Sequence, residues 1–221
     1  MIIAGVDEAG RGPVLGPMVM CAAAMEESDL VKLQALGVKD SKLLSREQRE
    51  RIFEALLDMI KYEVRIVEPS VIDEHVTSAT SNLNWLEAET TVDMLAKLNP
   101  DQAIVDCPST NIEAYSARIN RLLRANTKKT IKLIAEHKAD YRHAIVAAAS
   151  IIAKVTRDRE VDKIKAKYGV ECGSGYMTDP LTTEFLAKYW NKYPVFRKSW
   201  APWKNMRDNA AQQSLSGYNK L

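Results

Sequence analysis

The residues best suited to chemistry lie at the start of the chain. Asp7 and Glu8 directly follow an apolar run over residues 2–6, and the segment Gly10-Arg11-Gly12 follows them. An apolar run bounded by turn residues is typical of a buried strand. Carboxylates at its end cost free energy unless they are paired or bind a cation. The glycines let a ligand approach the backbone, and the arginine can donate to phosphate. Together they predict metal-assisted phosphoryl chemistry.

Two further acids occupy similar positions. Asp106 follows the apolar run 103–105, and Asp140 precedes an apolar helical stripe that begins at Ile145. If the strand before Asp106 neighbours the first strand, these carboxylates gather, repel one another and raise their pKa values unless divalent ions bind. Magnesium uses a few carboxylates plus substrate phosphate, and two ions about 3.5–4 Å apart support an in-line displacement. Glu136 is an alternative to Asp140.

Purely structural interpretations exist for each part of this pattern. Asp106 alone could cap a strand end, and Asp140 alone could stabilise a helix N-terminus through the helix dipole. A dinucleotide-binding loop is excluded, because Leu15 stands where the third glycine should fall and acids precede the loop.

The composition sets the class of protein. A chain of 221 residues fits one domain, or one domain with a small appendage, and 46% hydrophobic and 27% charged residues are ordinary for a soluble protein. The net charge of +2 requires any nucleic-acid surface to be local. Cys21, Cys107 and Cys172 have neither disulfide nor zinc spacing. With no signal peptide or apolar run of transmembrane length, we expect a cytoplasmic protein.

The apolar pattern predicts the elements that position these acids. Strands are expected over residues 2–6, 19–25, 62–67, 103–105 and 130–135. Helices are expected over residues 29–36, 46–61, 83–98, 112–125, 145–168 and 182–190, with a short one beginning at Pro69. Ser45 and Gln48 form a capping box, and residues 137–140 are expected as a loop. This order indicates a mixed sheet with helices packed on it.

Three motifs identify a family. Asp7-Glu8-Ala9-Gly10-Arg11-Gly12-Pro13, Lys138-Ala139-Asp140 and Gly173-Ser174-Gly175-Tyr176 resemble signatures of type 2 ribonuclease H, or ribonuclease HII, in an archaeal-like version. The resemblance implies an α/β, ribonuclease-H-like mixed five-stranded sheet flanked by helices, with a small C-terminal helical extension. It further implies a catalytic domain over residues 1–177, the extension over 178–208 and a tail over 209–221.

The resemblance also implies an activity. Members of the family hydrolyse the RNA strand of RNA–DNA hybrids and cut at ribonucleotides embedded in duplex DNA, leaving 5′-phosphate and 3′-hydroxyl ends. Two Mg²⁺ or Mn²⁺ ions are implied, with Asp7 bridging both, Glu8 and Asp106 on one and Asp140 on the other. The implied substrate-binding residues are Gly10, Arg11, Gly12, Lys42 and Tyr176. The hydroxyl of Tyr176 would meet the 2′-oxygen and its ring the next sugar.

The chain departs from the family pattern at one motif. His143-Ala144 stands where tyrosine-proline is usual after the Asp140 motif, so the start of the following helix must be fixed differently. Within that helix, Ser150 and Lys154 are interpreted as structural. Asn82 and Asn84 belong to an Asn-Leu-Asn segment that the family also carries.

Further partners are suggested near the C-terminus. Residues 186–207 mix basic and aromatic side chains without acids, which suits contacts to a nucleic-acid backbone. Gln212, Leu215 and Tyr218 resemble a sliding-clamp-binding peptide. We expect a monomer. Two other functions stay open: a resolvase-like metal-dependent nuclease, which would not need Tyr176, and a non-catalytic duplex-binding module, which would not need the acids.

Overall fold

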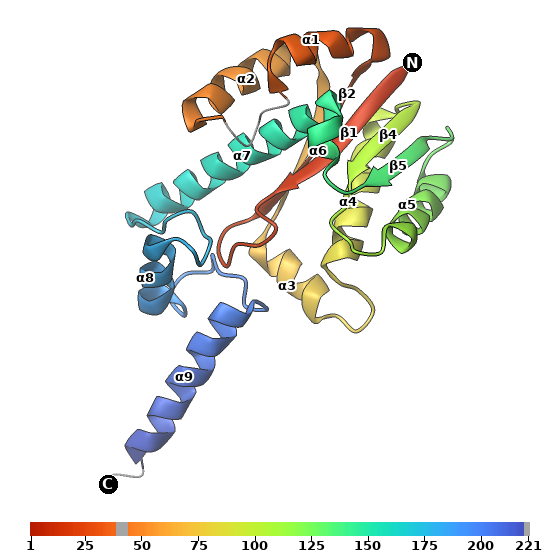
Figure 1. Ribbon diagram of the computed structural model, residues 1–221. Helices are drawn as coiled ribbons and strands as arrows, with labels where there is room; N and C mark the ends of the chain where they lie inside the picture. The colour runs from red at the N-terminus through yellow and green to blue at the C-terminus, as the bar shows by residue number, and fades with distance from the viewer. Residues whose placement is uncertain (39–43, 219–221) are drawn as a thin grey trace.

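A five-stranded sheet forms the centre of the protein, whose structure is a computed structural model describing residues 1–38 and 44–218, with side chains to residue 212. Its strands are β1 (Ile2–Ala9), β2 (Met18–Glu26), β3 (Lys61–Val67), β4 (Gln102–Asp106) and β5 (Lys132–Glu136). They lie in the order β3-β2-β1-β4-β5 (Figure 1). Strands β1, β2 and β3 pair antiparallel, whereas β4 runs parallel to β1 and β5 runs parallel to β4. The predicted mixed sheet is confirmed. The first and fourth strands are neighbours, which is the condition under which Asp7 and Asp106 come together.

Strand β1 is longer than the sequence predicted. Its expected end lay before Asp7, but the antiparallel ladder with β2 continues through the pairs Asp7–Cys21 and Glu8–Met20. The apolar residues of β2 are buried along nearly its whole length and supply the partner. Both acids are therefore held on a rigid strand and not on a loop.

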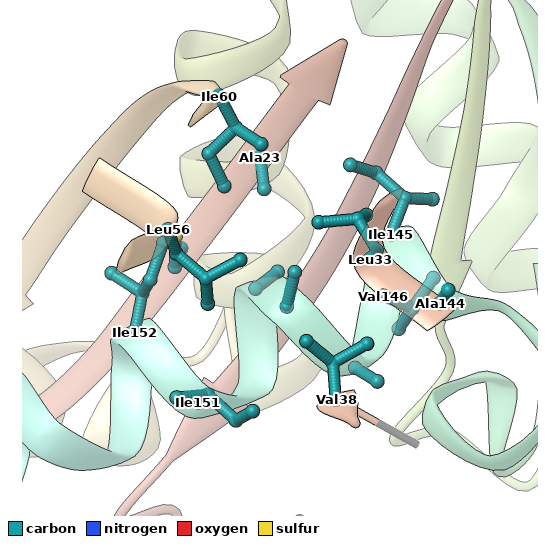
Figure 2. Close-up of a cluster of buried hydrophobic side chains, with 14 of the residues drawn as sticks. Ala23, Leu33, Val38, Leu56, Ile60, Ala144, Ile145, Val146, Ile151 and Ile152 are labelled. Atoms are coloured by element: carbon teal, nitrogen blue, oxygen red, sulfur yellow. The ribbon is translucent and has the colours of Figure 1, made fainter. Parts of the chain in front are cut away.

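Helices cover both faces of the sheet. They are η1 (Glu27–Asp29), α1 (Leu30–Ala35), α2 (Arg46–Met59), α3 (Pro69–Thr77), α4 (Leu83–Leu98), α5 (Ile112–Asn126), α6 (Ala139–Arg142), α7 (Ala144–Tyr168), α8 (Pro180–Tyr189) and α9 (Ala201–Tyr218). One apolar cluster joins α1, α2 and α7 to the sheet. Figure 2 shows Leu56 of α2 near Ile152 of α7, and Leu33 of α1 near Ile145 of α7. The opposite cluster joins the sheet to α3, α4 and α5. The sheet is thus the middle of three layers.

Helix α7 packs against β1 at very short range. The small buried side chains of its first half let the helix backbone approach the sheet; they are Ala144, Ala147, Ala148, Ala149 and Ala153. Gly5 of β1 completes this contact, because a Cβ there would lie 2.5 Å from the backbone of Ile145 and Val146. This close approach places the side chains of Ser150 and Lys154, on one face of α7, next to Asp7 and Glu8 of β1.

The helix starts follow local side-chain chemistry. The capping box at α2 is confirmed: Ser45 Oγ accepts from Gln48 N, and the Gln48 side chain accepts from Ser45 N. Asn82 caps α4 by accepting from Trp85 N. Asn111 caps α5 in the same way. Each cap satisfies an N–H that the helix leaves without a partner.

Two expectations differ from the structure. Residues 137–140 are not simply a loop, because α6 begins at Ala139 after a left-handed Lys138, and His143 N bonds Ala139 O to close the turn. In addition, α9 continues past residue 208, into the segment 209–221 that the sequence predicted as a separate tail. Helix propensity over residues 209–213, rich in alanine and glutamine, explains this continuation. The division of the chain into domains stays a prediction.

A third apolar cluster belongs to the C-terminal part. Leu15, from the segment between β1 and β2, packs there with Phe185, Phe196 and Trp203, and an isolated bridge pairs Leu15 with Phe196. The C-terminal segment therefore packs on the loop that follows the acids. Among the described residues no helix is long and apolar enough to cross a membrane.

Candidate active site

The four acids come from three elements that meet at one end of the sheet. Strands β1 and β4 are parallel, with Val6 opposite Val105, so the following residues Asp7 and Asp106 emerge at the same level. Asp106 Oδ1 then accepts a hydrogen bond of 3.1 Å from Ala139 N, which fixes the first turn of α6 and brings Asp140 to the group.

These acids line a single cavity of about 410 Å³. Eight of the predicted site residues share it: Asp7, Glu8, Gly10, Arg11, Gly12, Asp106, Asp140 and Tyr176. The remaining predicted residue, Lys42, lies outside the described residues. The sheet topology thus brings together side chains that are up to 169 positions apart in the sequence.

Burial dominates the electrostatics of the cavity. The pKa of Asp7 is raised from 3.8 to about 7. Burial is the largest cause and the negative charges of Asp106 and Asp140 add to it, while hydrogen bonds from Ser150 and Glu8 N act in the opposite direction. Burial, followed by repulsion from Asp7, also raises the pKa of Glu8 well above its usual value. The site therefore concentrates negative charge that only a proton or a cation can neutralise.

The carboxylates suit hard divalent cations. Within the described part of the chain, no three acidic, histidine or cysteine side chains already stand as ligands around one point. Magnesium does not need such a cage, because it keeps several waters and is commonly held by one or two carboxylates plus substrate phosphate. Clustered oxygen donors with raised pKa values on rigid elements fit this pattern.

The glycine segment after β1 needs glycine at its first position. Gly10 has φ 75°, and a Cβ there would lie 3.0 Å from Arg157 Nε, so both conformation and space require glycine. Arg11 turns toward α4, where Nε donates to Glu87 Oε1 at 2.8 Å and Nη2 donates to Asn84 Oδ1 at 2.7 Å. Burial raises the pKa of Glu87 to about 7, and Arg11 opposes this shift. A direct contact of Arg11 with phosphate stays a prediction.

Tyr176 lies beside the glycine segment. A Cβ on Gly12 would be 3.7 Å from Tyr176 Cε1, so the ring and that backbone are neighbours. The guanidinium of Arg157 lies 5.6 Å from the ring centroid. Tyr176 keeps 41% of its surface exposed, which leaves the ring open to a ligand entering the cavity.

Sequence reasoning missed the contribution of α7 to this cavity. Ser150, Lys154 and Arg157 all line it. Their spacing of four and three residues places them on one helix face, and this periodicity was the available signal. Burial lowers the pKa of Lys154 and that of Arg157. Arg49 of α2 is a further basic residue of the cavity.

Glu136 is occupied elsewhere. Its Oε1 accepts from Arg142 Nε at 3.0 Å and meets His143 Nε2 at 2.6 Å, and the hydrogen bond from Arg142 is the main reason that its pKa is lowered. It does not line the cavity. His143 thus connects the end of β5 to the start of α7, a role that the sequence left open.

The fold and the site together define a class. The sheet has the order β3-β2-β1-β4-β5, and the acids lie on the neighbouring strands β1 and β4 and on α6. This is a ribonuclease-H-like nuclease architecture. The family model described as Ribonuclease HII matches residues 4–203. Ribonuclease HII of Pyrococcus horikoshii is 43% identical over 223 residues, covering 98% of this chain and 97% of that relative. The chain belongs to the ribonuclease HII family.

Solved structures agree. The crystal structure of ribonuclease H2 from Pyrococcus horikoshii has a TM-score of 0.84 at 42% identity and covers 95% of this chain and 98% of its own. The ribonuclease HII in a PCNA:RNase HII complex from Archaeoglobus fulgidus has a TM-score of 0.82 at 38% identity. The match covers 90% of this chain and 95% of that chain. The predicted family, fold and nuclease class are confirmed.

Proposed function

We propose that this protein is an endonuclease that hydrolyses the RNA strand of RNA–DNA hybrids and cuts at ribonucleotides embedded in duplex DNA, leaving 5′-phosphate and 3′-hydroxyl ends. One observation carries the proposal: four carboxylates, a glycine segment and a tyrosine line the same cavity. The acids suit phosphodiester hydrolysis, and the other residues suit recognition of a sugar. Family membership supports the same activity.

Divalent-metal dependence is a property of the family, and we propose Mg²⁺ or Mn²⁺ as the ions, two in the working complex. Asp7, Glu8, Asp106 and Asp140 would hold them. When bound, such ions lower the pKa of a water and stabilise the leaving oxygen. Ser150 orients Asp7 through its hydroxyl, so the carboxylate keeps one position while metal and substrate bind.

The remaining groups of the cavity would bind the nucleic acid. Lys154 and Arg157 add positive charge beside the acids and offset their repulsion of a phosphate. Backbone groups of Gly10–Gly12 suit the ribose 2′-hydroxyl, because no side chain intervenes at the glycines, and Tyr176 would add a hydroxyl and a ring that packs against the next sugar. We also propose that Lys42, one of the substrate-binding residues implied by the family resemblance, binds near the scissile phosphate.

A single assay tests the activity. A duplex with one ribonucleotide and the matched all-DNA duplex are incubated with enzyme, with Mg²⁺, with Mn²⁺ or with chelator. Cleavage only at the ribonucleotide and only with metal is expected. Cleavage of the all-DNA duplex would instead indicate a resolvase-like nuclease, and binding without cleavage would indicate a duplex-binding module. Asp7→Asn is the control that removes turnover and keeps the side-chain shape.

We also propose that the C-terminal peptide with Gln212, Leu215 and Tyr218 binds a sliding clamp. A relative of known structure was solved as a complex with PCNA, and these positions fall in α9, which Figure 1 shows extending away from the sheet. Removal of residues 212–221 should abolish capture of the enzyme by an immobilised clamp and leave cleavage of a short duplex unchanged. Equal capture of both forms would refute this role.

A further inference from the structure

The glycine segment after β1 is held by a side chain from far along the chain. Arg197 is fully buried, although it precedes α9 in what the sequence shows as an appendage. Its Nη2 donates to Gly10 O at 2.5 Å and to Gly16 O at 3.0 Å. Its Nη1 donates to Arg11 O at 2.7 Å, and its Nε donates to Gly16 O at 3.1 Å. One guanidinium therefore fixes two carbonyls of the segment, those of Gly10 and Arg11, and the carbonyl of Gly16 beyond it.

A second residue of the extension continues this pattern. Trp200 Nε1 donates to Gly12 O at 3.1 Å, so the three consecutive carbonyls of Gly10, Arg11 and Gly12 are all bonded by the extension. The Arg197 guanidinium also lies 5.1 Å from the Trp200 ring. The two donors therefore form one unit behind the glycine segment.

Carbonyls held on one side orient N–H groups on the other. A trans peptide is planar, so the N–H of Arg11 points opposite to the C=O of Gly10, and the N–H of Gly12 points opposite to the C=O of Arg11. Within residues 1–38 and 44–218, neither N–H donates to another group of the chain. Both therefore face away from the buried Arg197, on the side where Gly10–Gly12 line the cavity.

We infer that Arg197 and Trp200 are positioning residues for ribose recognition: they hold the N–H donors of Arg11 and Gly12 in place for the 2′-hydroxyl of the substrate. This inference rests on the proposed function and deepens it. A segment rich in glycine has many accessible conformations, and binding would otherwise have to order it. Donors that are already ordered recognise a hydroxyl more strongly and more selectively.

A role in stability alone does not explain this arrangement well. Burial, followed by the nearby charge of Arg157, lowers the pKa of Arg197 to about 10, so placing this charged guanidinium in the interior costs free energy. Replacing buried charges by packed apolar side chains is often neutral or stabilising. A guanidinium is nevertheless suited to holding several carbonyls in one fixed geometry, because its donors form a rigid planar fork.

Trp200→Phe is the decisive variant, because it removes one indole N–H from a partly exposed position and keeps an aromatic ring. Trp203→Phe is the matched control: Trp203 Nε1 donates to Trp190 O at 2.8 Å, in the same extension but away from the glycine segment. Each variant is measured for kcat and KM on a duplex with one ribonucleotide, for Kd on the matched all-DNA duplex, and for Tm.

We expect Trp200→Phe to lower kcat/KM on the ribonucleotide duplex about fivefold, the effect of one hydrogen bond, with an unchanged Kd for all-DNA duplex. Trp203→Phe should leave both kcat/KM on the ribonucleotide duplex and Kd for the all-DNA duplex unchanged, whatever its Tm. Parental kcat/KM in Trp200→Phe would overturn the inference. An equal loss on both duplexes would overturn it too, because the bond would then serve general duplex binding.

Arg197→Lys tests the larger contribution, since lysine keeps the charge and loses the fork. A folded variant should lose about tenfold or more in kcat/KM on the ribonucleotide duplex, with the all-DNA Kd retained. Unchanged kcat/KM would refute the role of Arg197. If the variant does not fold, Trp200→Phe decides alone. Failure of the parent protein to cut at a ribonucleotide would instead refute the proposed function, so the two failures are distinguishable.

Discussion

In the absence of metal, the Asp7→Asn variant should be more stable than the parent protein, and the difference should grow as pH rises. Asp7 is buried at 6% exposure, and its pKa is raised from 3.8 to about 7, chiefly by burial. The folded state therefore binds more protons than the unfolded state between these values, and stability is lost as pH rises from about 4 to about 7. Each pKa unit corresponds to about 1.36 kcal/mol, so the loss is on the order of 4 kcal/mol. Asparagine avoids it and still accepts from Glu8 N.

The assay is thermal unfolding with chelator at several values between about pH 5 and about pH 8. At the upper end, Asp7→Asn should unfold roughly 10 °C above the parent, and the difference should shrink toward the lower end. Adding Mg²⁺ or Mn²⁺ should stabilise the parent most at high pH, because bound metal replaces protons, and should stabilise the variant less.

Asp179→Asn is the control of opposite sign. The pKa of Asp179 is lowered, chiefly by its hydrogen bonds from Ser174, so its ionised form stabilises the fold and the variant should be destabilised near neutral pH. Parallel pH profiles of the parent and Asp7→Asn would refute the reasoning, since Asp7 would then carry no buried charge that the fold must accommodate.

Three further outcomes are expected. Tyr176→Phe should lower kcat/KM about tenfold on a duplex with one ribonucleotide, while gel-shift affinity for the all-DNA duplex is retained, because only the 2′-hydroxyl contact is lost. Gly5→Ala should lower the free energy of unfolding by about 3 kcal/mol in denaturant titration, since its Cβ would lie 2.5 Å from the backbone of Ile145. Ser45→Ala should cost about 1 kcal/mol of stability in thermal unfolding, through loss of the bond from Gln48 N.

Much of the fold could be read from the sequence, because its strands are short apolar runs that end in acids or turns. The sequence indicated that Asp7 and Asp106 would meet only if their strands were neighbours, and the parallel pairing of β1 and β4 meets that condition. The continuation of β1 through Glu8 could not be read in this way. It depends on the pairing partner Met20, and polar residues in a strand do not show whether a ladder continues.

The sequence predicted the site residues that belong to local motifs. It did not predict the contacts that these residues make with side chains far away in the sequence. Arg11 is a clear example: its sequence neighbours suggest a phosphate donor, yet Glu87 and Asn84 of α4 take two of its donors. Nothing in a window around Arg11 indicates those partners. Arg197 is similar, because its carbonyl partners Gly10 and Gly16 precede it by more than 180 residues.

The carboxylates and the glycine segment of the site are held in place by different parts of the protein. Carboxylates that repel one another need rigid positions, and strands paired on both sides provide them for Asp7 and Asp106. A glycine segment has no rigidity of its own, so its order must be supplied from outside, and Arg197 and Trp200 supply it. The predicted domain boundary at residue 177 leaves all four acids in the catalytic domain. It separates the glycine segment, which precedes the boundary, from Arg197 and Trp200, which follow it. Our inference therefore predicts that selectivity for ribose, unlike hydrolysis, depends on the C-terminal extension.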